Sequence, residues 1–419
     1  MVPVLPTGSR LINNLMRAVL HIFILCFIPF FANAKTLHVG KSYAHTTIKQ
    51  ALLVAADGDT LYVHEGTYRE GNIEINKAIK LIGVNYPVID GEKKNEVISI
   101  RSVNVLVKGF KVIRSSYATL TDPCGIKVYE GRYVEVVDNI LDDNFFGIYL
   151  QNSKNCIVKN NKITAYGKLE QEIGNGIHCW RSDTLQITGN TIKGHRDGIY
   201  FEFVSGSVIW NNISANNIRY GLHFMFSNND IYINNFFKNN GAGVAVMFSK
   251  HVSMFNNTFI ENWGDAAYGL MLKEISDGYI SGNKFFNNTS GIYMEGASRM
   301  IVEKNIFDGN GWGMKIQASC LDNLINKNNF ISNTFDVSTN GTLVENKFEN
   351  NYWDKYDGYD LNKDGVGDVH FHPLSLFSVI VERNPPAMIL FRSFMVNLLD
   401  KSEKLIPSLT PDNFIDEKT

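Results

Sequence analysis

The feature that most constrains this chain is a repeat of about 22 residues that runs from Gly125 to Asn350. One anchor of the repeat is a glycine followed by an apolar residue, and successive anchors lie 22, 29, 22, 23, 22, 26, 22 and 22 residues apart. These glycines are Gly125, Gly147, Gly176, Gly198, Gly221, Gly243, Gly269, Gly291 and Gly313. A second anchor, asparagine followed two residues later by isoleucine or phenylalanine, keeps step with the first at Asn161, Asn190, Asn211, Asn234, Asn257, Asn283, Asn305, Asn328 and Asn346.

The residues between the anchors predict short β-strands. They form runs of three to five Val, Ile, Phe and Tyr residues, separated by Asn, Gly and Ser. The period is too short for helix-pair repeats, and the leucine consensus of leucine-rich repeats is absent. Each repeat is therefore expected to form one rung of an all-β parallel β-helix, whose rungs stack around a continuous core. Asparagine at a fixed place suits a tight turn and allows side chains of successive rungs to bond to one another.

The segments on either side of the repeat predict a helical cap and a helical tail. Thr46–Val63 reads as a short amphipathic helix that runs into a strand, and such a helix would cover the open end of the core. We expect the β-helix and its cap to span residues 35–350, with rungs beginning near Thr60. An Asp-rich loop at 351–370 and a tail at 371–419 are expected to follow.

The tail has the apolar spacing of a helix that begins at Pro385 and Pro386. This helix either caps the stack or docks on another protein, and Met388, Phe391 and Phe394 are its candidate partner contacts.

The first 34 residues are expected to be a cleavable export signal. Arg10 and Arg17 precede the apolar run Ala18–Phe31, and Ala32–Ala34 has the small-x-small pattern of a cleavage site. The apolar run is too short to span a bilayer comfortably, although an uncleaved anchor is the alternative. Translation starts at Met1 or at Met16.

The composition excludes a nucleic-acid binder and does not imply disulfides. Forty Lys and Arg residues against 42 Asp and Glu give a net charge of −2, so the chain has no excess of basic residues. The four cysteines beyond the signal are widely spaced and imply no disulfide framework.

Alternation along the strands predicts which side chains face outward. After each anchor glycine from Gly147 onward, the first and third positions are apolar or cysteine and are assigned to the core, so the second and fourth face outward. The outward pairs are Tyr149/Gln151, His178/Trp180, Tyr200/Glu202, His223/Met225, Ala245/Met247, Met271/Lys273, Tyr293/Glu295 and Lys315/Gln317.

One part of this outer face combines His223, Met225, Met247 and Met271, which we call the His/Met patch. Met247 should stack on Met225 one rung away, at about 4.8 Å, with Met271 diagonally beyond it. Thioether and imidazole ligands together suit Cu(I) better than Zn, Ca or Mg. Outward methionines are also unfavourable on a solvated sheet unless something covers them. The sequence thus leaves two interpretations, a Cu(I) site or a surface covered by a loop or a partner protein.

Neighbouring rungs add His178, Trp180 and Tyr200 as candidate partner-binding residues. Two rungs are longer than the rest, and their inserts precede Gly176 and Gly269, four rungs apart. Inserts in repeat proteins often lie on the binding face, so these two are expected to bracket the His/Met patch.

A candidate calcium loop follows the last rung. Asp360, Asn362, Asp364 and Asp368 supply alternating oxygen atoms, and Gly365 stands where such a loop turns. The twelfth position is Phe371 instead of Glu, so a loop of Asx turns without Ca²⁺ is the alternative.

Three segments together resemble the NosD family of nitrous oxide reductase maturation proteins. They are the rung Gly221–Met225, the block "NYWDKYDGYDLNKDGVGD" and the tail "NPPAMILFRSFMVNLLDKSEKLIPSLTP". The resemblance covers the mature chain almost end to end and implies a periplasmic right-handed β-helix. It implies work with an ABC-type ATPase and a membrane permease, and links to a copper-chaperone lipoprotein and to nitrous oxide reductase, whose copper-sulfur centre is assembled for denitrification. It supplies no ligand set, and the His/Met patch rests on strand alternation alone.

A rival interpretation is an enzyme of the polysaccharide lyase or hydrolase type on the same fold. Such chemistry needs carboxylates a few ångströms apart, whereas Glu202 and Glu295 lie four rungs apart, about 19 Å. The charged turn His195–Asp197 is expected to be solvated. A third interpretation is a structural or carbohydrate-binding β-helix. Because the two carboxylates are too far apart to cooperate, we expect no enzyme activity.

Overall fold

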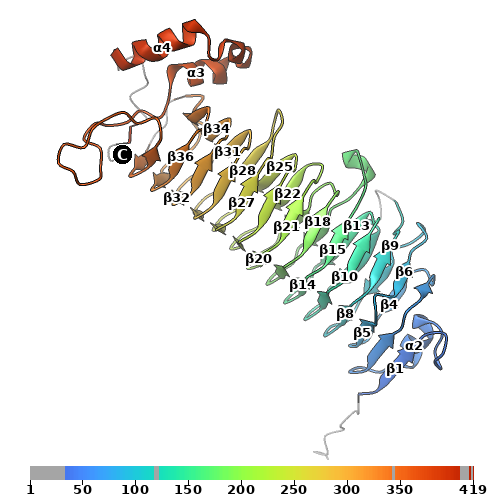
Figure 1. Ribbon diagram of the computed structural model, residues 1–419. Coiled ribbons are helices and arrows are strands. Elements are labelled where there is room, and N and C mark those ends of the chain that lie inside the picture. Colours follow the sequence, from blue (N-terminus) through green and yellow to red (C-terminus); the bar gives the residue numbers. More distant parts are fainter. Residues whose placement is uncertain (1–33, 118–121, 342–344, 406–414, 417–418) are drawn as a thin grey trace, which may run out of the picture.

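The computed structural model describes residues 34–117, 122–341, 345–405, 415–416 and 419. The chain winds into an elongated right-handed parallel β-helix, and successive turns stack along one axis (Figure 1). A full rung contributes one strand to each of three parallel sheets, here named A, B and C. The predicted fold class is confirmed.

Sheet A consists of β1 (Thr36–Val39), β2 (Thr60–Val63), β5 (Lys80–Gly83), β8 (Leu106–Lys108), β11 (Glu135–Val137), β14 (Ile157–Lys159), β17 (Gln186–Thr188), β20 (Val208–Trp210), β23 (Ile231–Ile233), β26 (Ser253–Phe255), β29 (Tyr279–Ser281), β32 (Ile301–Glu303), β35 (Leu324–Asn326) and β38 (Lys347–Glu349). Sheet B consists of β3 (Thr67–Tyr68), β6 (Val88–Asp90), β9 (Lys111–Ile113), β12 (Ile140–Asp142), β15 (Lys162–Thr164), β18 (Thr191–Lys193), β21 (Ile213–Ala215), β24 (Phe236–Lys238), β27 (Thr258–Ile260), β30 (Lys284–Phe286), β33 (Ile306–Asp308), β36 (Asn329–Ile331) and β39 (Tyr352–Trp353). Sheet C consists of β4 (Ile73–Ile75), β7 (Ile98–Ile100), β10 (Cys124–Tyr129), β13 (Phe146–Gln151), β16 (Ile177–Trp180), β19 (Ile199–Glu202), β22 (Tyr220–Met225), β25 (Ala242–Met247), β28 (Tyr268–Lys273), β31 (Ser290–Glu295), β34 (Trp312–Ile316) and β37 (Phe335–Ser338).

The core contains the residues that alternation assigned to it. Both core positions of sheet C are buried along the stack, and the sulfur-containing side chains Cys156, Cys179, Met254, Met294, Met300 and Met314 are fully buried. The four cysteines of the described chain are unpaired and buried, as their spacing indicated. Phenyl rings of successive rungs stack inside the core from Phe237 to Phe330 and end on Trp353.

Buried asparagines form the predicted ladder along the axis. Each side-chain amide donates to the side-chain oxygen of the next rung, through Asn139, Asn161, Asn190, Asn212, Asn235, Asn257, Asn283, Asn305, Asn328 and Asn351. At two rungs the anchor was assigned one residue too early, and a third predicted anchor, Asn346, lies outside this ladder, because it precedes β38 of sheet A and accepts from Asn323. Asn211 and Asn234 instead take the left-handed backbone conformation, with φ of 54° at both, and the following Asn makes the ladder bond. Asp416 accepts the last bond, from Asn351 Nδ2 at 2.9 Å.

At the N-terminal end, helix α2 (Ile48–Val54) buries Ile48 and Ala51 against the core, so the predicted helical cap is present. The first strand is earlier than expected, because β1 pairs with β2 from Thr36 onward rather than the rungs starting near Thr60. Residues 1–33, and with them most of the predicted export signal, lie outside the described residues. Within the described ranges, every helix is too short or too polar to cross a bilayer.

The C-terminal tail contains α3 (Leu376–Arg383), the 3₁₀ helix η2 (Pro385–Leu390) and α4 (Phe394–Leu405). The single helix expected from Pro385 is interrupted at Arg392, which has a φ of 64°. Phe335 of β37 contacts Phe377 of α3, and Lys315 Nζ lies 2.7 Å from Glu382. The tail therefore packs on the outer side of sheet C at its last rungs (Figure 1).

Candidate functional site

The strand register brings the four residues of the His/Met patch together as predicted. Met225 pairs with Met247, while His223 pairs with Ala245 and Ala245 pairs with Met271. Met271 is thus one rung beyond Met247 and one column to the side. The short side chain of Ala245 stands between His223 and Met271 in this column of sheet C.

The patch is less exposed than an outward assignment suggested. His223 keeps 6 % of its surface accessible and Met271 keeps 8 %, whereas Met225 and Met247 are half-buried. The rings of Tyr200 and Tyr220 cover the imidazole, with centroids 5.0 and 4.7 Å from it. Neighbouring aromatic side chains, which alternation could not place, therefore supply part of the cover that outward methionines need.

Two charged residues hold the His223 ring. Arg219 forms a two-pronged pair with Asp197, with Nε donating to Oδ1 at 2.9 Å and Nη2 to Oδ2 at 2.7 Å. The Asp197 Oδ2 atom lies 3.5 Å from Nδ1 of His223, and Arg219 Nη2 lies 3.4 Å from the same nitrogen. Burial raises the pKa of Asp197, but bonds from His223 and Arg219 outweigh burial and leave this pKa below its usual value.

The second nitrogen of the His223 ring lacks a partner in the part of the chain that the structure describes. Its Nε2 atom is buried and has no hydrogen-bond partner among the described residues. When Nδ1–H donates to Asp197, Nε2 carries the lone pair; when Nδ1 instead accepts from Arg219, Nε2 carries the proton. A carboxylate behind the ring is the usual support of a metal-binding histidine and favours the first tautomer. Buried polar groups normally find a partner, so the Nε2 atom of His223 is the candidate ligand atom of the His/Met patch.

The turn His195–Asp197 is not solvated, contrary to our expectation. His195 and Asp197 are fully buried, and His195 Nδ1 contacts the Gly174 carbonyl at 3.2 Å. The insert that precedes β16 covers this turn and includes the 3₁₀ helix η1 (Glu170–Glu172). Sequence spacing gave the position of the insert but not the buried polar groups below it.

The candidate partner residues His178 and Tyr200 continue the row of rings that ends at His223. His178 lies 4.9 Å from Tyr200 between ring centroids, and its Nδ1 lies 3.0 Å from Asn175 Nδ2. Burial, and next the Arg196 charge, lower the pKa of His178 to about 3, so this ring is neutral at physiological pH. Trp180 is half-buried, and the Arg181 guanidinium stacks on it at 4.5 Å.

Sequence reasoning missed a strip of exposed phenylalanines beside the two outermost methionines. Phe203, Phe226 and Phe248, here called the phenylalanine strip, are 46, 40 and 41 % exposed and stack with centroids 5.2 and 5.1 Å apart. All three have left-handed backbone angles, with φ of 53°, 50° and 53°. A bulky residue in this conformation is strained. The sequence does show their common position, because they directly follow Glu202, Met225 and Met247, the fourth residues after three successive anchor glycines.

The phenylalanine strip is not required by the fold. Asn152, Arg181, Glu274 and Gly296 fill the equivalent place in other rungs. Three successive rungs therefore carry both backbone strain and exposed apolar surface at one place, which is typical of an interaction surface.

The structure does not support the predicted calcium site. Asp360, Asn362 and Asp364 accept hydrogen bonds from backbone N–H groups of the loop, including Gly365 N to Asp360 Oδ2 at 2.9 Å. Asp368 likewise accepts from Leu361 N. The bonds to Asn362 and Asp364 form Asx turns, and all of these bonds satisfy the side-chain oxygens within the loop. Among the described residues, no group of three or more His, Cys, Asp and Glu side chains is arranged to hold a metal.

In the tail, the three candidate partner contacts differ. Met388 and Phe391 pack against Phe335 and Phe377, whereas Phe394 is 81 % exposed. Ile389 and Met395 are also exposed, so the tail presents an apolar surface that is displaced from the residues we expected.

The two carboxylates that the sequence placed on this face, Glu202 and Glu295, do not form the close pair that glycoside hydrolysis uses. Glu202 and Glu295 stand on β19 and β31, four rungs apart, and Glu295 is paired with Lys273 at 3.0 Å. This separation agrees with the sequence estimate and exceeds the reach of two cooperating carboxylates.

Comparisons with known proteins match most of the chain. A family described as "Periplasmic copper-binding protein (NosD)" matches residues 163–358. A probable ABC transporter binding protein NosD of Stutzerimonas stutzeri is 25 % identical over 84 % of both chains. Its namesake in Pseudomonas aeruginosa is 26 % identical over 88 % of this chain and 90 % of its own. The catalytic domain of a GH87 alpha-1,3-glucanase shares the fold, with a TM-score of 0.55 and 13 % identity over 76 % of this chain and 66 % of that domain.

Proposed function

We infer that this chain, which belongs to the NosD family, is the periplasmic component of an ABC-type transporter that matures the copper centre of nitrous oxide reductase. The family description names a periplasmic copper-binding protein, and the related proteins are named ABC transporter binding proteins. In this role the chain holds copper or a copper-carrying protein and performs no bond chemistry of its own. Its partners are the permease and ATPase of the transporter, a copper-chaperone lipoprotein and the reductase.

The observation that carries this proposal is the pairing of a ready imidazole nitrogen with thioethers. His223 offers a buried Nε2 atom without a protein partner, and its ring is fixed from behind by Asp197 and Arg219. Met225, Met247 and Met271 stand on the same and the next two rungs. An imidazole nitrogen and thioethers match the soft monovalent Cu(I) ion, whereas Mg²⁺ and Ca²⁺ prefer oxygen ligands.

The surroundings of the His/Met patch suit a transfer of copper between proteins. Met225 and Met247 are half-buried, so a ligand group of a docked partner can reach a bound ion. The phenylalanine strip borders the same methionines and gives a partner an apolar surface to cover. The exposed tail residues around Phe394 provide a second apolar surface, which we assign to the permease.

A Cu(I) titration of the mature protein against a competing chelator tests this proposal. We compare the wild type with His223→Ala and with Met225→Ala/Met247→Ala. Met395→Ala is the matched control, because Met395 is exposed on α4 and distant in sequence from the patch. Tight binding that is lost in both patch variants and retained in Met395→Ala is the expected result. If the wild type does not compete for Cu(I), or if the patch variants bind as well as it does, the ligand assignment is wrong.

A further inference from the structure

A hollow lies on the outer face of sheet C, four rungs from His223 toward the N-terminal end. Strands β4, β7 and β10 form its floor, and its volume is about 310 Å³. Asn72, Asn95, Ser99, Arg101, Ser116 and Tyr129 are among the lining residues. An adjoining hollow of about 290 Å³ shares Arg101 and Tyr129 and reaches Gln151. We call the two together the polar cleft.

Arg101 lines the polar cleft, and its guanidinium group has N–H donors without a carboxylate partner within the described ranges. Its guanidinium carbon lies 3.8 Å from the centroid of the Tyr129 ring, which fixes the plane of the group. Among the described residues, no carboxylate comes within ion-pair distance of Arg101. By contrast, Arg219 and Arg299 each make a two-pronged pair with an aspartate. A fixed guanidinium with free N–H groups is the usual receptor for a carboxylate.

Two carboxylates also line the polar cleft: Glu130 in the adjoining hollow, and Glu96 in the first hollow, where it is paired with Lys127. Glu96 accepts from the Tyr129 hydroxyl at 3.0 Å and from Ser99 Oγ, and Lys127 Nζ lies 3.9 Å from it. Lys127 is itself buried between the Tyr129 and Tyr149 rings, at 4.9 and 4.7 Å. Because the positive charge of Lys127 offsets that of Glu96, the positive charge of Arg101 remains available to an anion in the first hollow.

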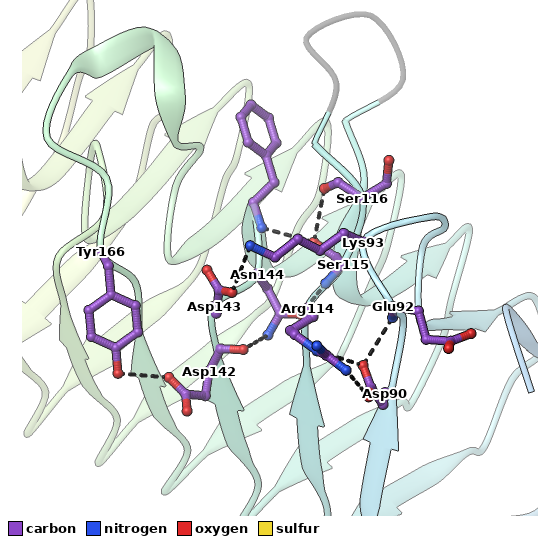
Figure 2. A network of polar contacts seen from close by, with 11 residues as sticks. Asp90, Glu92, Lys93, Arg114, Ser115, Ser116, Asp142, Asp143, Asn144 and Tyr166 are labelled. Atoms are coloured by element: carbon purple, nitrogen blue, oxygen red, sulfur yellow. Dashed lines mark hydrogen bonds and ion pairs between the residues drawn. The ribbon is translucent and has the colours of Figure 1, made fainter. Parts of the chain in front are cut away.

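A polar network holds the wall of the cleft in place. Asp90 pairs with Arg114 and accepts from the Glu92 N–H at 3.0 Å, and Lys93 pairs with Asp143 at 3.3 Å (Figure 2). The next residues of this wall, Lys94 and Asn95, line the cleft, and the Asn95 carbonyl accepts from Ser116 N at 2.8 Å. The wall is therefore formed before any ligand arrives, which lowers the entropy that binding costs.

The chemistry of the lining identifies the ligand class. Asn72, Asn95 and Ser116 line the same hollow as Arg101, and its volume suits one small polar molecule. We propose that the polar cleft binds a hydroxylated carboxylate of sugar size, such as a uronate, with the carboxylate on Arg101 and ring hydroxyls on the neighbouring amides. The adjoining hollow places Gln151 where a second unit of a chain would lie. The proposal is independent of copper and of the His/Met patch.

Calorimetric titration of the mature protein with galacturonate, trigalacturonate, galactose and succinate tests the proposal. Galactose lacks the carboxylate, and succinate lacks the ring hydroxyls. The variants are Arg101→Gln, which removes the charge, and Arg101→Lys, which keeps the charge without the two-pronged geometry. Lys159→Gln is the control, because Lys159 is exposed on β14 in sheet A. Circular dichroism confirms that each variant folds.

We expect galacturonate or its trimer to bind more tightly than galactose and succinate. Arg101→Gln should weaken this binding by about tenfold or more, and Arg101→Lys by less, with Lys159→Gln unchanged. A stronger signal from the trimer assigns the ligand to a glycan chain, and equal signals assign it to the free acid. Absence of binding at millimolar concentration, equal binding of galactose or succinate, or an unaffected Arg101→Gln variant overturns the proposal.

Discussion

Replacing Asp230 by asparagine should stabilise this protein, and more strongly at neutral than at acid pH. The Asp230 side chain is fully buried beside the stack of rungs, and its Oδ1 accepts from the Ser207 N–H at 2.8 Å. Its Oδ2 has no hydrogen-bond partner among the described residues. Burial raises the pKa of Asp230 to about 8, although the Ser207 bond opposes this rise. The native state therefore keeps this carboxyl protonated at pH 7.

The magnitude follows from the two pKa values of Asp230. In the unfolded chain the carboxyl ionises near pH 4. Between that pH and about 8 the native state binds one proton more than the unfolded state, so stability falls as pH rises. The loss at pH 7 is on the order of 4 kcal/mol, and at pH 4.5 about 1 kcal/mol. Asparagine does not titrate and escapes this loss.

Asparagine also fits the site, as an equivalent residue four rungs away shows. Asn323 accepts from the Met300 N–H at 2.9 Å, just as Asp230 accepts from Ser207. The Asn323 amide donates to the Ala297 carbonyl at 3.0 Å, and the same offset along the chain leads from residue 230 to the Val204 carbonyl. An amide at position 230 thus has a partner available.

Urea denaturation of the wild type and of Asp230→Asn at pH 4.5 and pH 7.5, followed by circular dichroism, measures the effect. The variant should have the higher midpoint at pH 7.5, and the gap should narrow at pH 4.5. Asp265→Asn serves as control, because Asp265 is exposed in the insert before β28. A gap that does not change with pH, or a variant less stable than the wild type at pH 7.5, would refute this reasoning.

Two further substitutions separate structural from functional residues. Asn257→Ala removes the bonds that Asn257 Nδ2 donates to Tyr232 O and to Asn283, and it leaves the Asn235 amide without its acceptor. We therefore expect the free energy of unfolding, measured by urea denaturation, to fall by about 2–4 kcal/mol. The control Asn329→Ala changes an exposed residue and should cost less than about 0.5 kcal/mol. An equal effect of the two would contradict a stabilising ladder. Phe226→Asn introduces a residue that tolerates the φ of 50° at this position, so the free energy of unfolding should stay unchanged or rise by up to about 1 kcal/mol. The affinity for the copper-chaperone lipoprotein in a surface-binding assay should fall. Unchanged affinity would remove the phenylalanine strip from the docking surface.

The fold was predictable because a rung is a local pattern repeated many times. Glycine spacing and strand alternation gave the parallel β-helix, the core positions and the pairing of Met225 with Met247, since one register error would have turned every side chain over. The two ladder positions misassigned at Asn211 and Asn234 show the limit. Two adjacent asparagines have different duties, and only the backbone conformation distinguishes them.

The candidate site was predictable only in part, because its cover comes from residues that follow no period. Alternation placed His223 outward but could not show that Tyr200 and Tyr220 enclose it or that Asp197 lies behind its ring. The phenylalanine strip and the polar cleft were missed for a related reason. The phenylalanine strip lies at corners, where the repeat carries no rule for side-chain direction, and the polar cleft lies on β4, β7 and β10, before the rung at Gly147 from which alternation was applied.

Because all rungs have about the same height, sites on the outer face of sheet C are separated by whole multiples of the strand spacing. Lys127, beside the polar cleft, and His223, in the His/Met patch, stand in one column with three rungs between them, so about 19 Å separates them. This distance changes only in whole steps, because gaining or losing one rung moves a site along the axis without rotating it. Extra residues that are not a full rung leave the column intact and emerge as inserts, as before β16 and β28. Adding or removing rungs can thus change the distance between the polar cleft and the His/Met patch during evolution. Lengthening a corner can change the shape of one site without moving the other.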